Sequence, residues 1–248
     1  MTSAASPATP PGVETRLRTR DGAMLFDARL APHADEQWFE PDRWPAAGTM
    51  DRVTGGRGRV VFLRDAARRW VLRHYRRGGA VASLFNDRYL WTGEDRTRAF
   101  REWRLLKRLE AWQLPVPLAV AARYQRHVIF YRADLITEEL PATVTLAETL
   151  QSTPLDAARW RAIGACLRRF HERGVQHADL TAHNILLVRE GDVHLLDFDR
   201  GRVRERGTWE DAVLARLQRS LLKVTSGLPS DRFDDARWRT LLAGYAGA

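Results

Sequence analysis

The segment that most constrains this chain is a polar loop set between a long apolar helical pattern and two short apolar runs. The helical pattern covers residues 155–173, and the apolar runs follow within residues 185–196. The loop carries Asp179 and, five positions later, Asn184, and Asp197 directly follows the second run. A helix, a loop and a hairpin in this order favour a fold that presents oxygen-bearing side chains at one end of the hairpin.

Two carboxylates and an amide in this arrangement match the requirements of phosphoryl transfer. That reaction needs a carboxylate near the attacking hydroxyl and oxygen ligands for the Mg²⁺ that bridges the phosphates. We therefore assign Asp179 to orienting the hydroxyl and accepting its proton, and Asn184 and Asp197 to binding metal. The segment that begins at His177 resembles the protein-kinase catalytic loop H-R-D-x-x-x-x-N, and residues 197–199 resemble the D-F-G metal motif. The resemblance implies ATP and Mg²⁺ as cofactors.

A glycine cluster upstream matches the kinase glycine loop G-x-G-x-x-G-x-V in part. Gly55 and Gly58 match the second and third glycines, whereas Val53 replaces the first. We assign both matching glycines to nucleotide binding, because backbone without a side chain can approach a phosphate closely. A plain turn explains the same cluster as well.

The strand lysine of the kinase pattern is absent, and Arg73 occupies its place after the apolar run 70–72. An arginine there would hold the ATP phosphates with a permanently charged, planar fork. Glu102 lies on the predicted amphipathic helix 95–112 and is the expected ion-pair partner of Arg73. The alternative for Glu102 is an exposed charge on the helix surface.

The whole pattern predicts an α+β, bilobal, protein-kinase-like fold. We expect a flexible tail over residues 1–12, an N-terminal ATP-binding lobe over 13–137 and a mainly helical C-terminal catalytic lobe over 138–248. Strands are predicted at 60–63, 70–72, 118–124, 127–131 and 135–136, and helices at 95–112, 145–151, 155–173 and from 209 onward. The polar connector 137–141 is the predicted hinge, and its Glu138 and Leu140 are assigned to the nucleotide.

Two departures from the protein-kinase pattern narrow the class of acceptor. Asp199 replaces the glycine of D-F-G, and nothing after it resembles the A-P-E element that closes an activation segment. Without an activation segment, a protein substrate is not expected. A small-molecule or glycolipid acceptor is favoured instead.

Five blocks together resemble the 3-deoxy-D-manno-octulosonic acid (Kdo) kinases of Gram-negative bacteria. The blocks are residues 72–79, 97–103, 114–117, 177–187 and 197–201. The resemblance implies phosphorylation of the 4-hydroxyl of Kdo on a lipid A precursor during synthesis of the lipopolysaccharide inner core. It also implies a peripheral position on the cytoplasmic face of the inner membrane.

Composition agrees with this resemblance without proving it. The net charge is +9, and Lys107 and Lys223 are the only lysines, so arginine carries nearly all the positive charge. Such a surface suits an acceptor with phosphates and a carboxylate, or an anionic membrane, although genomic bias would give the same composition.

The single cysteine, Cys166, excludes an intramolecular disulfide. No apolar run reaches the length of a membrane span, and no signal peptide is recognisable, so we expect a cytoplasmic protein.

Three other readings remain open. Aminoglycoside- and choline-phosphotransferase-like enzymes share the H-x-D-x-x-x-x-N pattern and lack an activation segment. A non-catalytic kinase-like binding module is suggested by the missing lysine. Nucleic-acid binding rests on net charge alone, because no nucleic-acid motif accompanies it.

Overall fold

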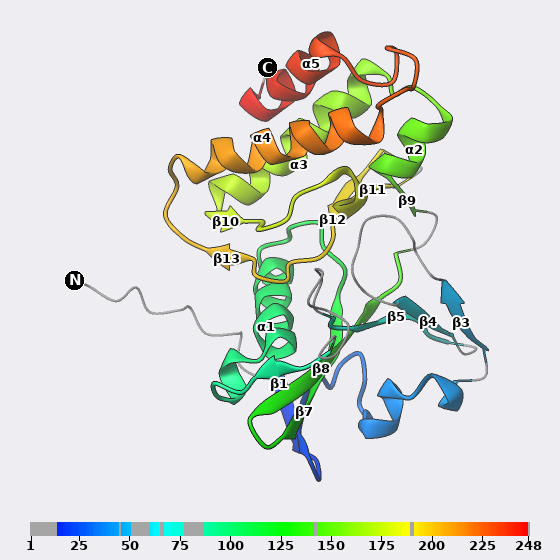
Figure 1. The fold of residues 1–248 in the computed structure, drawn as a ribbon, viewed down its shortest axis with the longest axis vertical. Coiled ribbons are helices and arrows are strands. Elements are labelled where there is room, and N and C mark those ends of the chain that lie inside the picture. Colours follow the sequence, from blue (N-terminus) through cyan, green and yellow to red (C-terminus); the bar gives the residue numbers. More distant parts are fainter. Residues whose placement is uncertain are drawn as a thin grey trace. The chain divides into compact units, whose positions relative to one another are not determined.

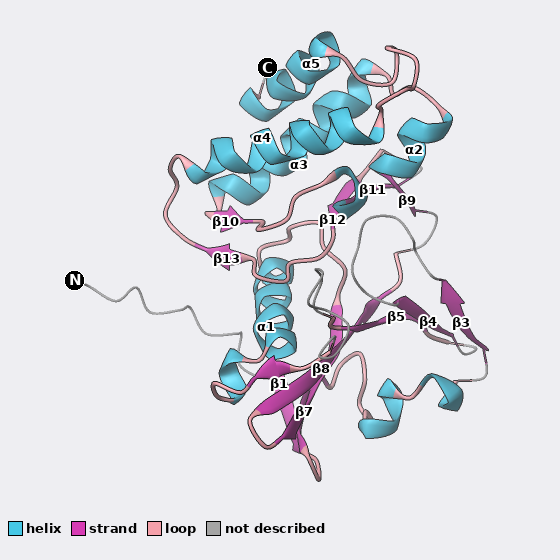
Figure 2. Ribbon diagram, viewed as in Figure 1, coloured by secondary structure: helices cyan, strands magenta, loops and turns pink. Residues whose placement is uncertain are grey.

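The structure is a computed structural model that describes residues 14–44, the backbone of 46–50, and residues 60–64, 67–76, 87–140, 143–188 and 191–247. The chain divides into two compact units. Unit 1 comprises Met1–Trp112 and Leu118–Glu139, and unit 2 comprises Gln113–Pro117 and Leu140–Ala248. The sequence places one boundary after residue 137, whereas the units divide after Glu139 and the segment behind the first long helix groups with unit 2. Figure 1 and Figure 2 show unit 1 as mostly strand and unit 2 as mostly helix.

Unit 1 is built on an eight-stranded antiparallel sheet in the order β1-β2-β7-β8-β5-β4-β3, with β6 paired to β8. The strands are β1 (Glu14–Arg18), β2 (Gly22–Asp27), β3 (Ala46–Met50), β4 (Val60–Arg64), β5 (Arg69–His74), β6 (Tyr89–Leu90), β7 (Ala119–His127) and β8 (Phe130–Glu138). The predicted β4–β5 hairpin is confirmed, with Leu63 opposite Trp70 and both buried. Strands β1, β2, β3 and β6 were not predicted.

One helix, α1 (Arg98–Ala111), packs against β7 and β8 of unit 1. Its buried residues recur at the expected spacing, as the sequence predicts: Phe100, Trp103, Leu106 and Leu109. Glu102 and Lys107 are buried on the same helix. Burying two charged groups on an apolar face is costly unless each has a partner; Lys107 pairs with Asp27 at 2.7 Å, and the partners of Glu102 belong to the candidate site.

Two predicted boundaries around β8 were wrong. The stretch 127–131 was predicted as one strand, but residues Val128 and Ile129 form the turn between β7 and β8. The connector was predicted to begin at Thr137, but Thr137 and Glu138 still pair with Val71 and Trp70 of β5. Strand β8 is therefore longer than predicted at its end, and the polar residues there continue the sheet.

Unit 2 contains four helices among the described residues: α2 (Leu146–Ser152), α3 (Ala157–Glu172), α4 (Trp209–Val224) and α5 (Asp235–Ala246). The predicted helices at 145–151 and 155–173 are confirmed to within a few residues, and the helical region predicted from 209 onward consists of two helices, α4 and α5. Thr145 and Glu148 form a capping box at the start of α2, and Asp156 caps α3, so both helices begin at residues that satisfy free backbone donors. No helix in the described ranges is both long and apolar enough to cross a membrane.

Two small antiparallel sheets accompany these helices. Strand β11 (Ile185–Val188) lies between β12 (Val193–Leu195) and β9 (Thr143–Thr145), and β10 (Val175–Gln176) pairs with β13 (Arg202–Val203). At Gly174, before β10, φ is +67° and a Cβ would meet the Arg204 carbonyl oxygen at 2.1 Å. Only glycine fits there, and it turns the chain from α3 into the loop that carries the predicted site.

Candidate active site

The loop after β10 is held by the buried side chain of His177. The His177 Nε2 lies 2.7 Å from the Leu196 carbonyl oxygen, and the Asp179 backbone N–H donates to His177 Nδ1 at 3.2 Å. One ring nitrogen donates and the other accepts, which requires the neutral imidazole. Burial lowers the pKa of His177 and so favours that form. His177 thereby ties the backbone beside Asp179 to the backbone beside Asp197.

Asn184 makes a second tie across the same loop. Its side-chain Nδ2 donates to the backbone carbonyl oxygen of Asp179 at 2.8 Å. Its backbone carbonyl oxygen accepts from the Leu196 N–H at 2.9 Å. Asn184 ends a short 3₁₀ helix, η5 (Ala182–Asn184), which leads directly into β11. The structure thus brings together the loop segments that carry the three predicted residues, Asp179, Asn184 and Asp197.

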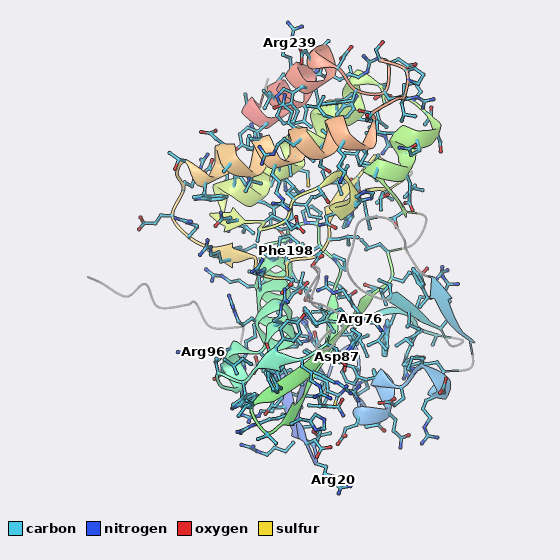
Figure 3. All side chains as sticks on the ribbon, in the orientation of Figure 1. Arg20, Arg76, Asp87, Arg96, Phe198 and Arg239 are labelled. Atoms are coloured by element: carbon cyan, nitrogen blue, oxygen red, sulfur yellow. The ribbon has the colours of Figure 1, made fainter. Side chains whose placement is uncertain are left out.

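Asp197 has φ of +63°, in the left-handed region. Aspartate tolerates this region better than most residues, and such a conformation is commonly kept for a functional reason. The next residue, Phe198, is buried and stacks on Phe170 with ring centroids 5.7 Å apart, while its centroid lies 4.8 Å from that of His177. Phe198, labelled in Figure 3, therefore anchors the turn that presents Asp197.

Asp179 also has a charged partner that the sequence analysis missed. Its carboxylate forms a salt bridge with Arg216 of α4, and both side chains are about half exposed, at 55% and 48%. One turn later on α4, the Ser220 hydroxyl accepts from the Ala182 N–H at 3.1 Å. Positions 216 and 220 share one helix face, so this face of α4 supports the loop. In the sequence, the four-residue spacing of Arg216 and Ser220 was the signal that could have indicated a shared polar helix face.

Unit 1 contains a three-membered cluster around the buried carboxylate of Glu102. Arg73 Nη2 of β5 pairs with Glu102 Oε2, and the Tyr75 hydroxyl donates to the same oxygen at 2.5 Å. The predicted Arg73–Glu102 ion pair is therefore present, and the exposed-charge alternative for Glu102 is wrong, because that residue is 3% exposed. Burial, followed by the charge of Glu102, raises the pKa of Tyr75 well above its ordinary value. Tyr75 was not predicted as part of this cluster.

For the other residues predicted to bind the nucleotide, the structure gives less information. Gly55 and Gly58 lie outside the described residues. Glu138 is exposed at the end of β8 in unit 1. Leu140 belongs to unit 2 and its carbonyl oxygen accepts from the Thr143 hydroxyl at 3.0 Å. The assignment of these four residues to the nucleotide stays a prediction.

The residues assigned to metal have suitable donor atoms. In the described ranges no cluster of three or more His, Cys, Asp or Glu side chains forms a ready-made metal site. Mg²⁺ is usually held by one or two protein carboxylates together with phosphate oxygens and water. Asp197 supplies a carboxylate, and the Asn184 amide, whose nitrogen is turned to the Asp179 carbonyl, has its oxygen left as a donor atom. The pair fits a magnesium–nucleotide complex better than a bare ion.

Comparison with known proteins adds independent information. A model of the lipopolysaccharide kinase (Kdo/WaaP) family matches residues 42–245. A protein of Xylella fastidiosa (strain 9a5c), named 3-deoxy-D-manno-octulosonic acid kinase, is 43% identical over 207 residues, which cover 83% of this chain and 82% of that protein. Proteins of the same name from Xanthomonas campestris pv. campestris (strain B100) and Stenotrophomonas maltophilia (strain K279a) are 45% and 42% identical, each over 82% of this chain and 81% of their own length.

Proposed function

The chain belongs to the lipopolysaccharide kinase (Kdo/WaaP) family, and from this membership we propose that it transfers the γ-phosphate of ATP to the 4-hydroxyl of Kdo on a lipid A precursor. The protein is a kinase with an alcohol group as acceptor, and it acts on Kdo in synthesis of the lipopolysaccharide inner core. Use of the 4-hydroxyl and the protein-kinase-like arrangement of the fold are part of the proposal. The wide coverage of the named relatives supports it.

The observation that carries the mechanism is the hydrogen-bonded loop of unit 2. His177 and Asn184 each bond both to the backbone of Asp179 and to Leu196, next to Asp197. A proton acceptor and a metal ligand fixed relative to each other are what phosphoryl transfer requires, because its catalysis depends mainly on positioning and on charge stabilisation.

In this mechanism the Asp179 carboxylate orients the acceptor hydroxyl and takes its proton as the oxygen attacks phosphorus. Arg216 keeps the carboxylate in place through its salt bridge. We therefore assign Arg216 as a positioning residue for Asp179.

Asn184 and Asp197 would hold Mg²⁺ through one amide oxygen and one carboxylate. When bound, the ion neutralises phosphate charge that grows in the transition state. The ring of Phe198, buried and stacked on Phe170, fixes the backbone next to Asp197. The donors are thus in place before the nucleotide arrives, so little reorganisation is needed on binding.

Arg73 is assigned to the phosphates of ATP. Its guanidinium is held by Glu102 from α1 and lies 5.0 Å from the centre of the Tyr75 ring. A guanidinium fixed on two sides keeps its remaining N–H groups in one direction, which suits two oxygens of a phosphate chain. This arrangement takes the place of the usual strand lysine.

We further propose that the activity is located on the cytoplasmic face of the inner membrane. ATP and the lipid-anchored acceptor meet at that surface, and the arginine-rich chain with net charge +9 suits anionic lipid.

The function is tested by an acceptor screen with labelled ATP. The purified protein is incubated with ATP and Mg²⁺ and offered a Kdo-bearing lipid A precursor, an aminoglycoside, choline or a generic protein substrate. We expect label on the Kdo-bearing lipid alone, and much less with Asp179→Asn. Preferred labelling of an aminoglycoside or choline would replace the proposal with the related small-molecule kinase activity.

A further inference from the structure

The turn between β7 and β8 carries exposed apolar side chains, which we call the apolar tip. The turn residues Val128 and Ile129 are 82% and 56% exposed, and Leu90 of the adjoining strand β6 is 56% exposed. Leu90 pairs with Phe130, and the Trp91 N–H donates to the Ile129 carbonyl oxygen at 2.8 Å, so these residues lie together. Exposed aliphatic side chains gathered on neighbouring backbone segments commonly mark an interaction site.

Val128 is also strained. Its φ is +53°, a region that a β-branched residue rarely occupies. Two-residue hairpin turns normally use Gly, Asn or Asp at such a position, because these residues adopt positive φ at low cost. This turn instead carries two aliphatic β-branched residues, and Val128, the strained one, is 82% exposed and gains little from packing. Backbone strain that is not offset by side-chain packing points to a function for the side chains themselves.

Arginines surround this apolar tip. Arg18 at the end of β1 and Arg20 in the β1–β2 turn are exposed, as is Arg126 near the end of β7. The two hairpins are joined by a hydrogen bond of 2.6 Å from the Arg126 N–H to the Asp21 carbonyl oxygen. Within the part of the chain that the structure describes, none of the three arginines forms a salt bridge. Figure 3 shows Arg20 pointing outward from the hairpin end.

An open depression of about 600 Å³ lies at the same place, lined by Arg18, Arg20, Arg126, Trp91 and Val128 among others. The Arg126 guanidinium stacks over Trp91 at 4.8 Å from the ring centre. Two acidic residues also line it: Asp21, which is exposed, and Glu94, which is paired with Arg16 at 2.6 Å and with the Tyr124 hydroxyl at 2.8 Å. Because arginines outnumber acidic residues in the lining and Glu94 is neutralised by Arg16, the depression carries net positive charge beside the Trp91 ring and Val128.

We propose that this hairpin tip, formed by Leu90, Val128, Ile129 and the three arginines, docks the protein on an anionic phospholipid bilayer. The aliphatic residues enter the interface, and the arginines bind headgroup phosphates around the depression. Insertable aliphatic groups ringed by arginine and tryptophan match the amphipathic chemistry of interfacial membrane segments. The proposal rests on the proposed function in one respect, because a lipid-anchored acceptor gives the kinase a reason to bind a bilayer.

The first test removes the apolar tip without harming the turn. Val128→Gly combined with Ile129→Ser installs a Gly-Ser turn, which supplies positive φ without strain. Thermal unfolding should show a stability equal to or above that of the unchanged protein. Sedimentation with vesicles of phosphatidylethanolamine and phosphatidylglycerol should show at least about tenfold weaker binding, because the inserted apolar area is lost. Leu222→Ser, which removes another exposed aliphatic side chain, is the matched control and should bind normally.

The second test removes charge. Arg18→Gln and Arg20→Gln should each weaken vesicle binding about fivefold, the usual effect of one arginine near an anionic surface. Added salt should weaken the unchanged protein in the same way, and vesicles of phosphatidylcholine should bind poorly. Arg239→Gln, on exposed α5 surface, is the control and should leave binding unchanged. If the turn variant proves unstable, the two arginine variants decide the matter.

Kinase activity separates this inference from the proposed function. On a deacylated, water-soluble Kdo acceptor the tip variants should match the unchanged protein, and on vesicle-bound acceptor they should be slower. Inactivity of every variant on both acceptors would defeat the proposed function and leave the vesicle result standing. Failure of the unchanged protein to bind anionic vesicles, or unchanged binding by the turn variant, would overturn the docking surface. Loss of self-association in the turn variant, without any vesicle binding, would assign the tip to a protein contact and also overturn it.

Discussion

Removing the Arg73 guanidinium tests the cluster that we assign to the ATP phosphates. In Arg73→Ala the Glu102 carboxylate, whose side chain is 2% exposed, keeps only the Tyr75 hydroxyl of its two partners named above. Breaking a fully buried ion pair costs roughly 3–5 kcal/mol. Because the Arg73 side chain is 22% exposed, we expect a loss at or below the low end, about 2–3 kcal/mol. For a chain of this size that lowers the melting temperature by roughly 5–10 °C.

The catalytic effect should be separable from this loss of stability. Arg73→Ala should raise the KM for ATP or lower kcat by roughly ten- to a thousandfold, since a charge-assisted phosphate contact is lost. Arg73→Lys should recover only part of the activity, because an ammonium group lacks the planar fork. Steady-state kinetics at a temperature where every variant is folded gives both parameters. Arg104→Ala on the same helix as Glu102 is the control, because its partly exposed pairs with Glu14 and Asp95 are far less costly to lose.

A double-mutant cycle of Arg73→Ala and Glu102→Gln completes this test. Residues that act as one unit give a non-additive loss, so the double variant should be little worse than Arg73→Ala alone. Additive losses would mean that Glu102 does not orient the arginine. Full activity of Arg73→Ala would mean that another group holds the phosphates, with Arg57 and Arg59, outside the described residues, as the first candidates.

The remaining predictions concern the loop of unit 2 and one buried histidine. Asp179→Asn should lower kcat at least about a hundredfold with the melting temperature nearly unchanged, because the amide keeps the shape but accepts no proton; normal turnover would refute the assignment of the base. Arg216→Gln should lower kcat about tenfold while leaving the KM for ATP unchanged, because the residue acts through Asp179; a rise in that KM alone would place Arg216 on the nucleotide instead. Asp197→Asn should shift the magnesium titration of activity to higher concentration, and an unchanged titration would remove Asp197 from the metal site. Burial lowers the pKa of His171 from 6.5 to about 4. The unfolded chain then binds more protons than the folded chain below pH 6.5, so stability should fall by about 2 kcal/mol between pH 7 and pH 5, and His171→Phe should reduce that fall in a pH series of denaturation curves.

The loop residues could be predicted from the sequence because their arrangement is local. Asp179, Asn184 and Asp197 lie within one short stretch, and a helix, loop and hairpin fix their relative positions with few alternatives. Arg73 and Glu102 are farther apart, and their pairing was predicted only because the kinase pattern supplied it. The partners that no pattern supplied, Arg216 and Tyr75, were missed.

These misses have a physical reason. The contact of Arg216 depends on which face of α4 packs against the loop, and the role of Tyr75 depends on how α1 lies on the sheet; both are decided by tertiary packing. The Val128–Ile129 turn was missed because β-branched residues favour strands, and here the chain reverses in spite of that preference. The hairpin β1–β2 was missed because neither strand alternates: β1 has one aliphatic residue, Leu17, and β2 contains a short continuous apolar run, residues 23–26, whose period does not tell a strand from a helix.

The position of the transferred phosphate tests the central claim most directly. The product of ATP, Mg²⁺, the purified protein and a Kdo-bearing lipid A precursor is isolated, and mass spectrometry and NMR locate the added group. The account predicts one phosphate, on the 4-hydroxyl of Kdo, that is absent when Asp179→Asn replaces the unchanged protein. A phosphate on the lipid A sugars, or an unmodified acceptor after complete incubation, would contradict it.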